Sequence, residues 1–231
     1  MKTAALFLLL FLGSLGAQTA FDTHFEHRTM RIDLFHSGDA GMERFALDTI
    51  RCDGPWSGST SVLQDPLDLG LYRVVVLAPG QKEELYTAGF ASIFGEWQTT
   101  PEARSQWGTN HESLRIPWPR HTVSVRIDKR DAQNRFQPIW SHTVDPTYRQ
   151  IIPTDAPSPC AHFLIWGEDD PEHRLDIVFL GDGYTQKEMP KFREDARRLA
   201  GYLLEAEPYR SLKDRITVRA VETPSLDSGV T

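Results

Sequence analysis

The stretch LYRVVVLAPGQKEELYTAG, residues 71–89, decides the fold of the first two thirds of the chain. Val74, Val75 and Val76 are β-branched and favour a strand, because branched side chains pack well on a pleated surface. Pro79 and Gly80 then supply the residues that a tight turn requires. We therefore predict a β-hairpin over these residues.

The same pattern continues on both sides of this hairpin. In TMRIDLF, residues 29–35, the apolar side chains alternate with Arg31 and Asp33, as expected of a half-buried strand whose inner face carries Met30, Ile32 and Leu34. Residues 121–144 read as a second hairpin with the polar tip KRDAQNR and three inward residues, Val123, Val125 and Ile127. Many short strands without a convincing helix predict an all-β N-terminal domain, an antiparallel β-sandwich over residues 21–150.

The composition changes after residue 150. IIPTDAPSPC, residues 151–160, contains three prolines, which favour an extended tether, so we expect a Pro-rich linker over residues 151–164. LDIVFL, residues 175–180, is an apolar run apart from Asp176, of the kind buried on both faces of an α/β sheet. A helix from near Met189 to Pro208 follows, with its apolar face on Phe192, Ala196, Leu199 and Leu203, and RITVRAVET gives another strand.

Strand, helix and strand are the beginning of an α/β domain, which we place at residues 165–231. A domain of this kind needs on the order of a hundred or more residues to bury its core. We therefore expect this domain to be incomplete, that is, truncated at the C-terminus.

The first residues, 1–20, predict a signal peptide. Lys2 precedes a short apolar run, and small residues near Ala17–Ala20 offer a cleavage point, which indicates a secreted or periplasmic protein. The run is too short for a membrane span. The net charge of −7 argues against a nucleic-acid or anionic-membrane partner, since either needs a concentrated basic surface.

Four residues are candidates for chemistry. Cys52 and Cys160 form a possible disulfide in an exported chain, although two partly buried thiols are the alternative. Asp182 and its neighbour Tyr184 follow a strand end, where open α/β sheets collect ligands, and are possible substrate or metal contacts. The glycines on either side of Asp182 fit a tight turn better than a phosphate-binding loop, because a carboxylate repels phosphate.

The sequence contains no complete catalytic motif. Gly-x-Ser-x-Gly is absent, and so is the His-Glu-x-x-His pattern that places two zinc-binding imidazoles on one helical face with a glutamate as base. We therefore assign no catalytic residue and no metal ligand within these residues.

Several long strings nevertheless resemble one family. They include FDTHFEHRTMRIDLFHSGD, GFASIFGEWQTTPEA, HRLDIVFLGDGYTQKEMPKFREDARRL and PYRSLKDRITVRAVETPSLDSGV, which run from residue 21 to the end of the chain. The chain is similar to the secreted bacterial IgA-peptidase family of zinc metallopeptidases, metallopeptidase family sixty-four. The resemblance implies an N-terminal β-sandwich, an α/β catalytic domain, a protein substrate and a zinc cofactor. It also implies that the zinc-binding His-Glu-x-x-His helix follows the segment resembling PSLDSGV, so that this chain by itself is inactive.

Two alternatives have no catalytic role. The sandwich is either a module that recognises a host glycoprotein or glycan, or a spacer that stabilises the catalytic domain. Recognition would use exposed indole rings, which stack on sugars and anchor interfaces, and the candidates are Trp56, Trp97, Trp107 and Trp118. For GFASIFGEWQTT, residues 89–100, we predict a structural plug: Gly89 and Ala91 continue a strand, Gly95 permits a bend, and Phe90, Ile93, Phe94 and Trp97 are apolar bulk.

Overall fold

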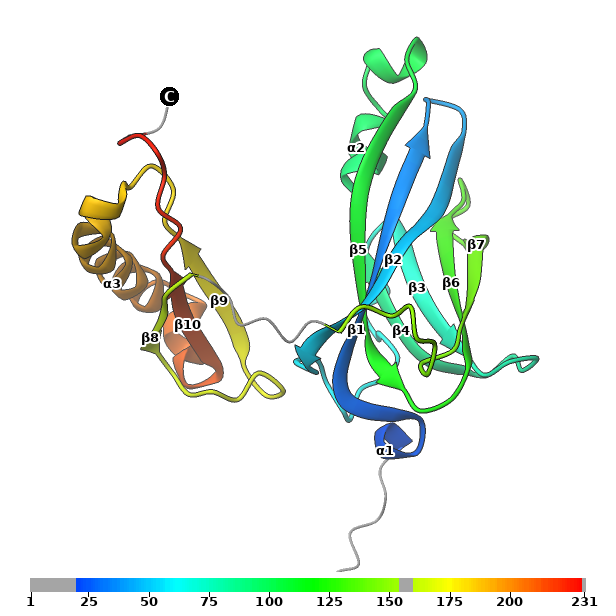
Figure 1. The fold of residues 1–231 in the computed structure, drawn as a ribbon, viewed down its shortest axis with the longest axis horizontal. Helices are drawn as coiled ribbons and strands as arrows, with labels where there is room; N and C mark the ends of the chain where they lie inside the picture. The colour runs from blue at the N-terminus through cyan, green and yellow to red at the C-terminus, as the bar shows by residue number, and fades with distance from the viewer. Residues whose placement is uncertain (1–19, 154–159, 230–231) are drawn as a thin grey trace, which may run out of the picture.

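The computed structural model describes residues 20–153 and 160–229, which build two bodies with separate hydrophobic cores (Figure 1). The first body consists of two antiparallel sheets, and the second is a small sheet with a helix on one face. The signal sequence predicted over residues 1–20 lies outside the described residues except for Ala20, which begins the short helix α1, Ala20–His24.

The first sheet has the strand order β2-β1-β5. Its strands are long and antiparallel, and their bounds are β1 Phe25–Gly38, β2 Glu43–Pro55 and β5 Gly108–Pro119. The alternation in TMRIDLF explains why β1 is central. Ile32 pairs with Ile50 of β2 on one side and with Leu114 of β5 on the other, so all three apolar side chains share one face.

The second sheet has the order β4-β3-β6-β7 and contains both predicted hairpins. Its strands are β3 Tyr72–Leu77, β4 Glu84–Phe90, β6 Val123–Arg130 and β7 Phe136–Val144. Gly80 has φ +70° in the β3–β4 turn, a left-handed conformation that glycine adopts without steric cost. Both hairpin predictions are confirmed.

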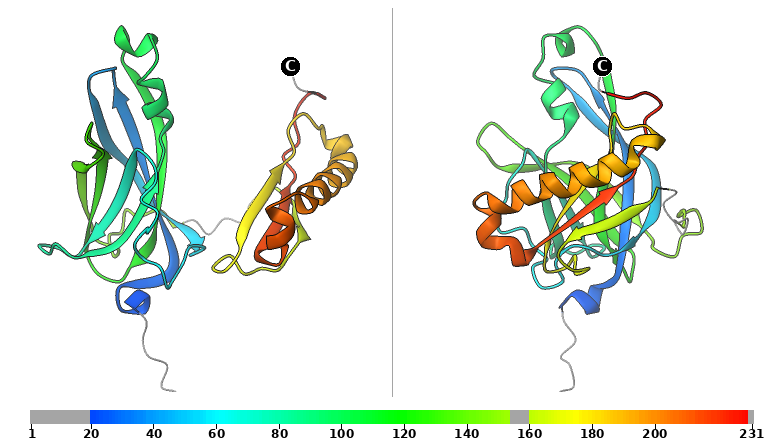
Figure 2. Two further views of the ribbon diagram at one scale, coloured as in Figure 1. Left: turned by 180° about the vertical axis from the view of Figure 1, so that it is seen from behind. Right: turned by 90° about the vertical axis from the view of Figure 1, so that its left-hand side faces the viewer.

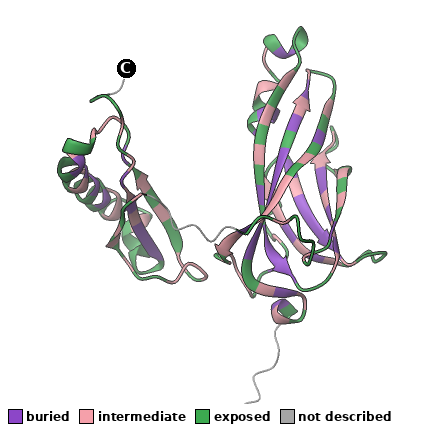
Figure 3. Cartoon of the chain, in the orientation of Figure 1, coloured by how far each residue is buried: buried purple, intermediate pink, exposed green. Residues whose placement is uncertain are grey.

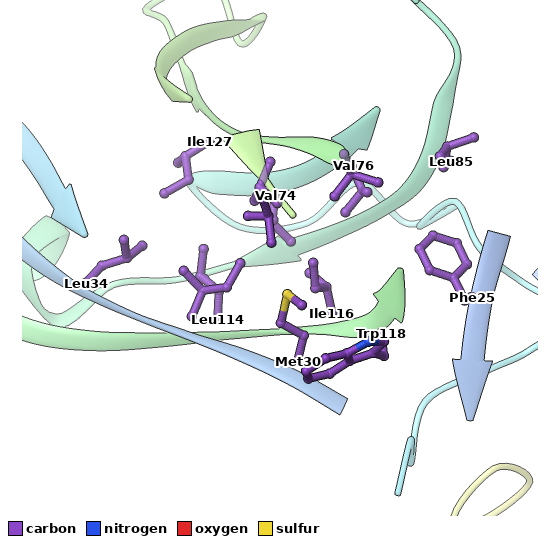
Figure 4. Packing of buried hydrophobic residues seen from close by; sticks show 14 of the residues in the cluster. Phe25, Met30, Leu34, Val74, Val76, Leu85, Leu114, Ile116, Trp118 and Ile127 are labelled. Atoms are coloured by element: carbon purple, nitrogen blue, oxygen red, sulfur yellow. The ribbon is translucent and has the colours of Figure 1, made fainter. Parts of the chain in front are cut away.

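The core lies between these two sheets (Figure 4). Figure 4 shows Met30, Ile116 and Trp118 of the first sheet near Val74 and Val76 of the second. The residues predicted to point inward are all buried: Met30, Ile32, Leu34, Val123, Val125 and Ile127. Each fully buried aliphatic side chain stabilises the fold by about 1.5–3 kcal/mol. The antiparallel β-sandwich is confirmed.

GFASIFGEWQTT contains a helix that the sequence analysis did not predict, α2, Ile93–Trp97, at one end of the sandwich (Figure 1). Ser92 caps it, because its side chain accepts a hydrogen bond from the Gly95 amide. The predicted bend at Gly95 is therefore wrong, since this residue lies inside the helix. Phe94 is fully buried, as a plug requires, but Ile93 is 74% exposed and contributes nothing to it. A 3-10 turn, η1, Glu102–Arg104, precedes β5.

The second body is a three-stranded sheet in the order β8-β10-β9. Its strands are β8 His162–Trp166, β9 Leu175–Leu180 and β10 Ile216–Val221, with β10 parallel to β9 and antiparallel to β8. Helix α3, Met189–Glu205, crosses one face of this sheet (Figure 2), and three short helical segments complete the body: η2 Gln186–Glu188, α4 Tyr209–Leu212 and η3 Lys213–Arg215. The mixed sheet and its β-α-β unit agree with the predicted α/β fold of this part of the chain. Strand β8 starts inside the range expected for the linker. Its alternate residues Phe163 and Ile165 pack against the buried residues between the sheet and α3.

Helix α3 begins at Met189 as predicted, yet its buried face differs from the prediction. Phe192, Ala196 and Ala200 are buried, whereas Leu199 is 47% exposed. Four-residue steps keep side chains on one helical face, so the small residue at 200 replaces the leucine expected there.

Strand β9 is not buried on both faces as its apolar sequence predicted. Among the described residues, α3 covers only one face of the sheet, and β9 lies at its edge. Leu175, Val178 and Leu180 are between 54% and 62% exposed, in contrast to the buried residues of the neighbouring β10 (Figure 3).

Candidate functional site

The carboxyl ends of the parallel strands β9 and β10 lie side by side, which is the position where open α/β sheets bind ligands. Two segments meet there: the loop GDGYT, residues 181–185, after β9, and residues 222–229 after β10. We call these two segments the carboxyl edge. Their geometry shows what the sequence-predicted residues Asp182 and Tyr184 can do.

Hydrogen bonds hold the two segments of the carboxyl edge together. The Gly183 amide donates to Ser225 Oγ at 2.9 Å, and the Ser225 amide donates to the Tyr184 carbonyl at 2.8 Å. Thr223 Oγ1 donates to the Gly181 carbonyl at 2.8 Å. Gly183 has φ +73°, so the loop needs glycine at this position. The loop is therefore a fixed turn, as predicted, and it is braced by a segment about forty residues later in the sequence.

The start of helix α3 is tied to the same edge. Thr185 and Glu188 form a capping box, in which Glu188 Oε2 accepts from the Thr185 amide at 2.9 Å. Ser228 Oγ donates to the other oxygen of Glu188 at 2.8 Å. The hydrogen bond from the Thr185 amide is the main reason why the pKa of Glu188 lies below its ordinary value. Glu188 is thus a structural acceptor at this edge.

Tyr184 faces helix α3 and not an open site. Its hydroxyl donates to Asp195 Oδ2 at 3.0 Å, and this hydrogen bond raises the pKa of Tyr184. Arg198 and Lys191 also bind Asp195, at 2.6 and 2.5 Å, and they lower the pKa of its carboxyl. The ring of Tyr184 packs on Phe192 with centroids 5.4 Å apart. Tyr184 therefore braces the loop against the helix.

Asp182 is exposed at the tip of the same loop, so its carboxylate faces solvent. Over residues 20–153 and 160–229, no group of three or more His, Cys, Asp or Glu side chains is arranged to hold a metal ion. A zinc ion takes at least three protein ligands. The described residues therefore do not by themselves fit a zinc centre, and the role of Asp182 as a substrate or metal contact stays a prediction.

We did not predict the ion pair that lies at this edge. Arg193 of α3 reaches Glu222, at the end of β10, with two bonds of 2.5 and 2.9 Å. Glu222 is only 8% exposed, so the bidentate pair fixes the helix to the sheet. The position of Glu222, an acidic residue directly after an apolar strand, was the feature of the sequence that could have indicated this pair.

A second polar cluster lies in the sandwich beside α2. His36 is fully buried, and its Nε2 lies 2.9 Å from Glu43 Oε2 while its Nδ1 lies 3.1 Å from Glu112 Oε1 and 3.2 Å from Ser92 Oγ. Burial opposes protonation of His36, but the hydrogen bonds to Glu112 and Glu43 outweigh it and raise its pKa. Lys129 and the Tyr72 hydroxyl also bind Glu43. The pKa of Glu43 is lowered to about 2, since its hydrogen bonds outweigh the effect of burial.

Serine, histidine and glutamate are the residue types of a hydrolase triad, but this cluster cannot react with a substrate. Ser92 is 7% exposed, and its oxygen is already engaged in capping α2 and in a hydrogen bond to Glu112. The cluster therefore holds the end of the sandwich together.

The remaining candidate residues are dispersed. Cys52 is buried and Cys160 is half-buried, and the disulfide between them stays a prediction. Of the four tryptophans proposed to contact glycans, Trp118 is buried and only Trp107, at 55%, is largely exposed. In the part of the chain that the structure describes, no helix combines the length and the apolar character of a bilayer span.

A β-sandwich followed by a β-α-β unit with a braced carboxyl edge defines the class: an antiparallel β-sandwich joined to an α/β unit. Each of the two parts matches a protein-family model. Residues 20–141 match the Peptidase M64 N-terminus, and residues 165–231 match the IgA Peptidase M64 domain. The chain belongs to the M64 family of metallopeptidases, which implies a metal cofactor and a protein substrate. A search of curated proteins finds no match.

Proposed function

We propose that this chain is the N-terminal part of an exported zinc metallopeptidase that hydrolyses peptide bonds, with an activity of the IgA-peptidase type. The observation that carries the proposal is that both parts of one peptidase family match in order, the second of them on the β-α-β unit. In this proposal residues 21–150 are the N-terminal domain, residues 151–164 connect the domains, and residues 165–231 begin the peptidase domain.

We place the zinc ligands after residue 231. The resemblance of PSLDSGV to the segment that precedes the family's His-Glu-x-x-His helix supports this placement. The carboxyl edge then has a positioning role: its two bonded segments lead the chain out of β10 in a fixed direction. Asp182, exposed at the tip, is suited to contact the substrate, whereas Tyr184 keeps the loop on α3.

Export is the third part of the proposal. The basic Lys2 and the apolar run after it support secretion or delivery to the periplasm. Cleavage near Ala17–Ala20 would leave the sandwich as the N-terminus of the mature protein. Mass spectrometry of the protein recovered from the exported fraction tests this directly, and an intact Met1 there would refute it.

Proteolysis tests the enzymatic proposal. The chain ending at Thr231 and a product of a reading frame continued past Thr231 are incubated with casein and with immunoglobulin A. We expect cleavage only by the longer protein, and we expect a chelator to abolish it and added zinc to restore it. Asp182→Asn in the longer protein is expected to raise KM with little change in kcat. A contact to the substrate stabilises the ground state and the transition state equally, so its loss weakens binding alone.

Two results would contradict the proposal. Chelator-sensitive cleavage by the chain ending at Thr231 would place the metal site within these residues. Failure of the longer, zinc-loaded protein to cleave either substrate would remove the peptidase function and leave recognition of a host glycoprotein by the sandwich as the alternative.

A further inference from the structure

The open side of the sandwich carries a cleft that is unrelated to the carboxyl edge. It lies where β2, at the edge of one sheet, approaches β7, at the edge of the other, and the segment after β7 crosses between them. Two adjoining cavities of about 250 and 230 Å³ share four lining residues, Ile50, His142, Tyr148 and Ile151. We call these two cavities together the edge cleft.

The walls of the edge cleft combine an apolar floor with aromatic and polar groups. Leu47, Ile50 and Ile151 supply the apolar surface. His142 lies beside Trp140, with ring centroids 5.9 Å apart and planes 15° from parallel, so the two rings form an aromatic wall. Tyr148 is 54% exposed at the mouth. The polar lining of the larger cavity consists of Asp48, Thr49 and Gln150.

The segment that closes the cleft is held at both ends. At one end Asp145 Oδ1 accepts from the Thr147 amide at 2.9 Å, and the Tyr148 amide donates to the Asp145 carbonyl at 3.1 Å. At the other end the Ile152 amide donates to the Ile50 carbonyl of β2 at 2.9 Å. A ligand would therefore meet a preformed site and would lose little affinity to ordering it.

The lining also restricts the chemistry of the ligand. Among the described residues that line the two cavities none is Lys or Arg, so an anionic ligand finds no counter-charge. The two carboxylates, Asp48 and Asp145, line different cavities, and Asp48 is already paired with His111 at 3.0 Å, so a metal cation is not favoured. The ligand is thus neutral.

A purely apolar ligand fits less well than one with hydroxyl groups. An apolar side chain placed over Asp48, Thr49 and Gln150 would exclude water from these groups without replacing its hydrogen bonds, which is costly. A pyranose ring has one apolar face for an aromatic ring and a rim of hydroxyls for a carboxylate and an amide. We propose that the edge cleft binds a neutral pyranose sugar, independently of any peptidase activity.

Sugar binding to the full chain tests this proposal. Methyl β-galactoside, methyl α-mannoside, N-acetylglucosamine and their disaccharides are the probes, measured by saturation-transfer NMR and calorimetry. We expect at least one of them to bind with a millimolar Kd. Tyr148→Ala is expected to weaken binding about tenfold through loss of the stacked ring, and Gln150→Ala about fivefold through loss of a hydrogen bond.

Two further variants act as controls. Trp107→Ala removes an aromatic side chain that is equally exposed, at 55%, but does not line the cleft, and it should leave the Kd within about twofold. Tyr148→Phe keeps the ring and should retain binding. Thermal melting of each variant establishes that the sandwich is folded.

Three outcomes would overturn the proposal: no probe binds up to about 20 mM, a concentration that still detects very weak sites; Trp107→Ala weakens binding as much as Tyr148→Ala; or N-acetyl-phenylalaninamide binds the cleft and the sugars do not. The last outcome would make the cleft a pocket for a peptide side chain.

Discussion

Replacement of Ser92 by alanine tests whether the polar cluster around His36 stabilises the sandwich. Ser92 Oγ accepts from the Gly95 amide at 3.2 Å, and loss of an N-cap bond of this kind costs about 1 kcal/mol. The same hydroxyl donates to Glu112, and leaving that part-buried carboxylate without this donor costs a further 1–3 kcal/mol, roughly. The variant should therefore lose about 2–4 kcal/mol in the free energy of unfolding.

Thermal melting followed by tryptophan fluorescence measures this loss. For a domain of this size each kcal/mol lowers Tm by about 3–5 °C, so we expect a decrease of roughly 6–20 °C. Ser105→Ala is the matched control, because Ser105 is exposed and its hydroxyl donates only to the nearby Glu102 carbonyl. A Tm for Ser92→Ala within about 2 °C of the control would refute the reasoning, since both hydrogen bonds would then be energetically neutral.

Three further predictions concern other parts of the molecule. Trp97→Ala should destabilise the sandwich by about 1–3 kcal/mol in urea unfolding, because the half-buried indole packs against Phe94 of its own helix and against Gly108 of β5. An unchanged midpoint or an equal loss in Trp107→Ala would contradict this. The pKa of His36 is raised above its ordinary 6.5, so its charged form stabilises the fold fully below pH about 6.5, and that contribution is lost as the pH rises through the folded pKa. Unfolding measured from pH 5 to 9, roughly, should show this decline, and His36→Gln should flatten it. Gly183→Ala should cost about 1–2 kcal/mol because φ is +73°, whereas Gly201→Ala, in an open position on α3, should stabilise the helix by about 0.5–1 kcal/mol. Unfolding followed by circular dichroism measures the stability of the two glycine variants. Equal changes in stability would rule out backbone strain at position 183.

The sequence was sufficient for those elements whose residues interact with near neighbours. Alternation at Met30, Ile32 and Leu34 predicted a buried strand face, and Pro79 with Gly80 predicted a turn, because both signals depend on local geometry. The helix that begins near Met189 was predicted in the same way, from the spacing of apolar residues along the chain.

Other features depend on contacts between distant residues and could not be predicted. Helix α2 has only five residues, too few for a periodic pattern. His36 becomes a buried cluster member because the strands bring Glu112, 76 positions away, and Ser92, 56 positions away, against it. The edge cleft likewise requires Asp48 and Gln150 to meet across two sheets, which no local spacing reveals.

The exposed position of β9 has a consequence for the behaviour of the chain in solution. A parallel strand at the border of a sheet offers its unpaired amides and carbonyls as a template on which another extended chain can add. Leu175, Val178 and Leu180 would make such additions hydrophobic, and Asp176 is the one charged residue within the strand. We therefore expect Asp176 to oppose self-association along this strand, as a charged residue within an exposed apolar strand does.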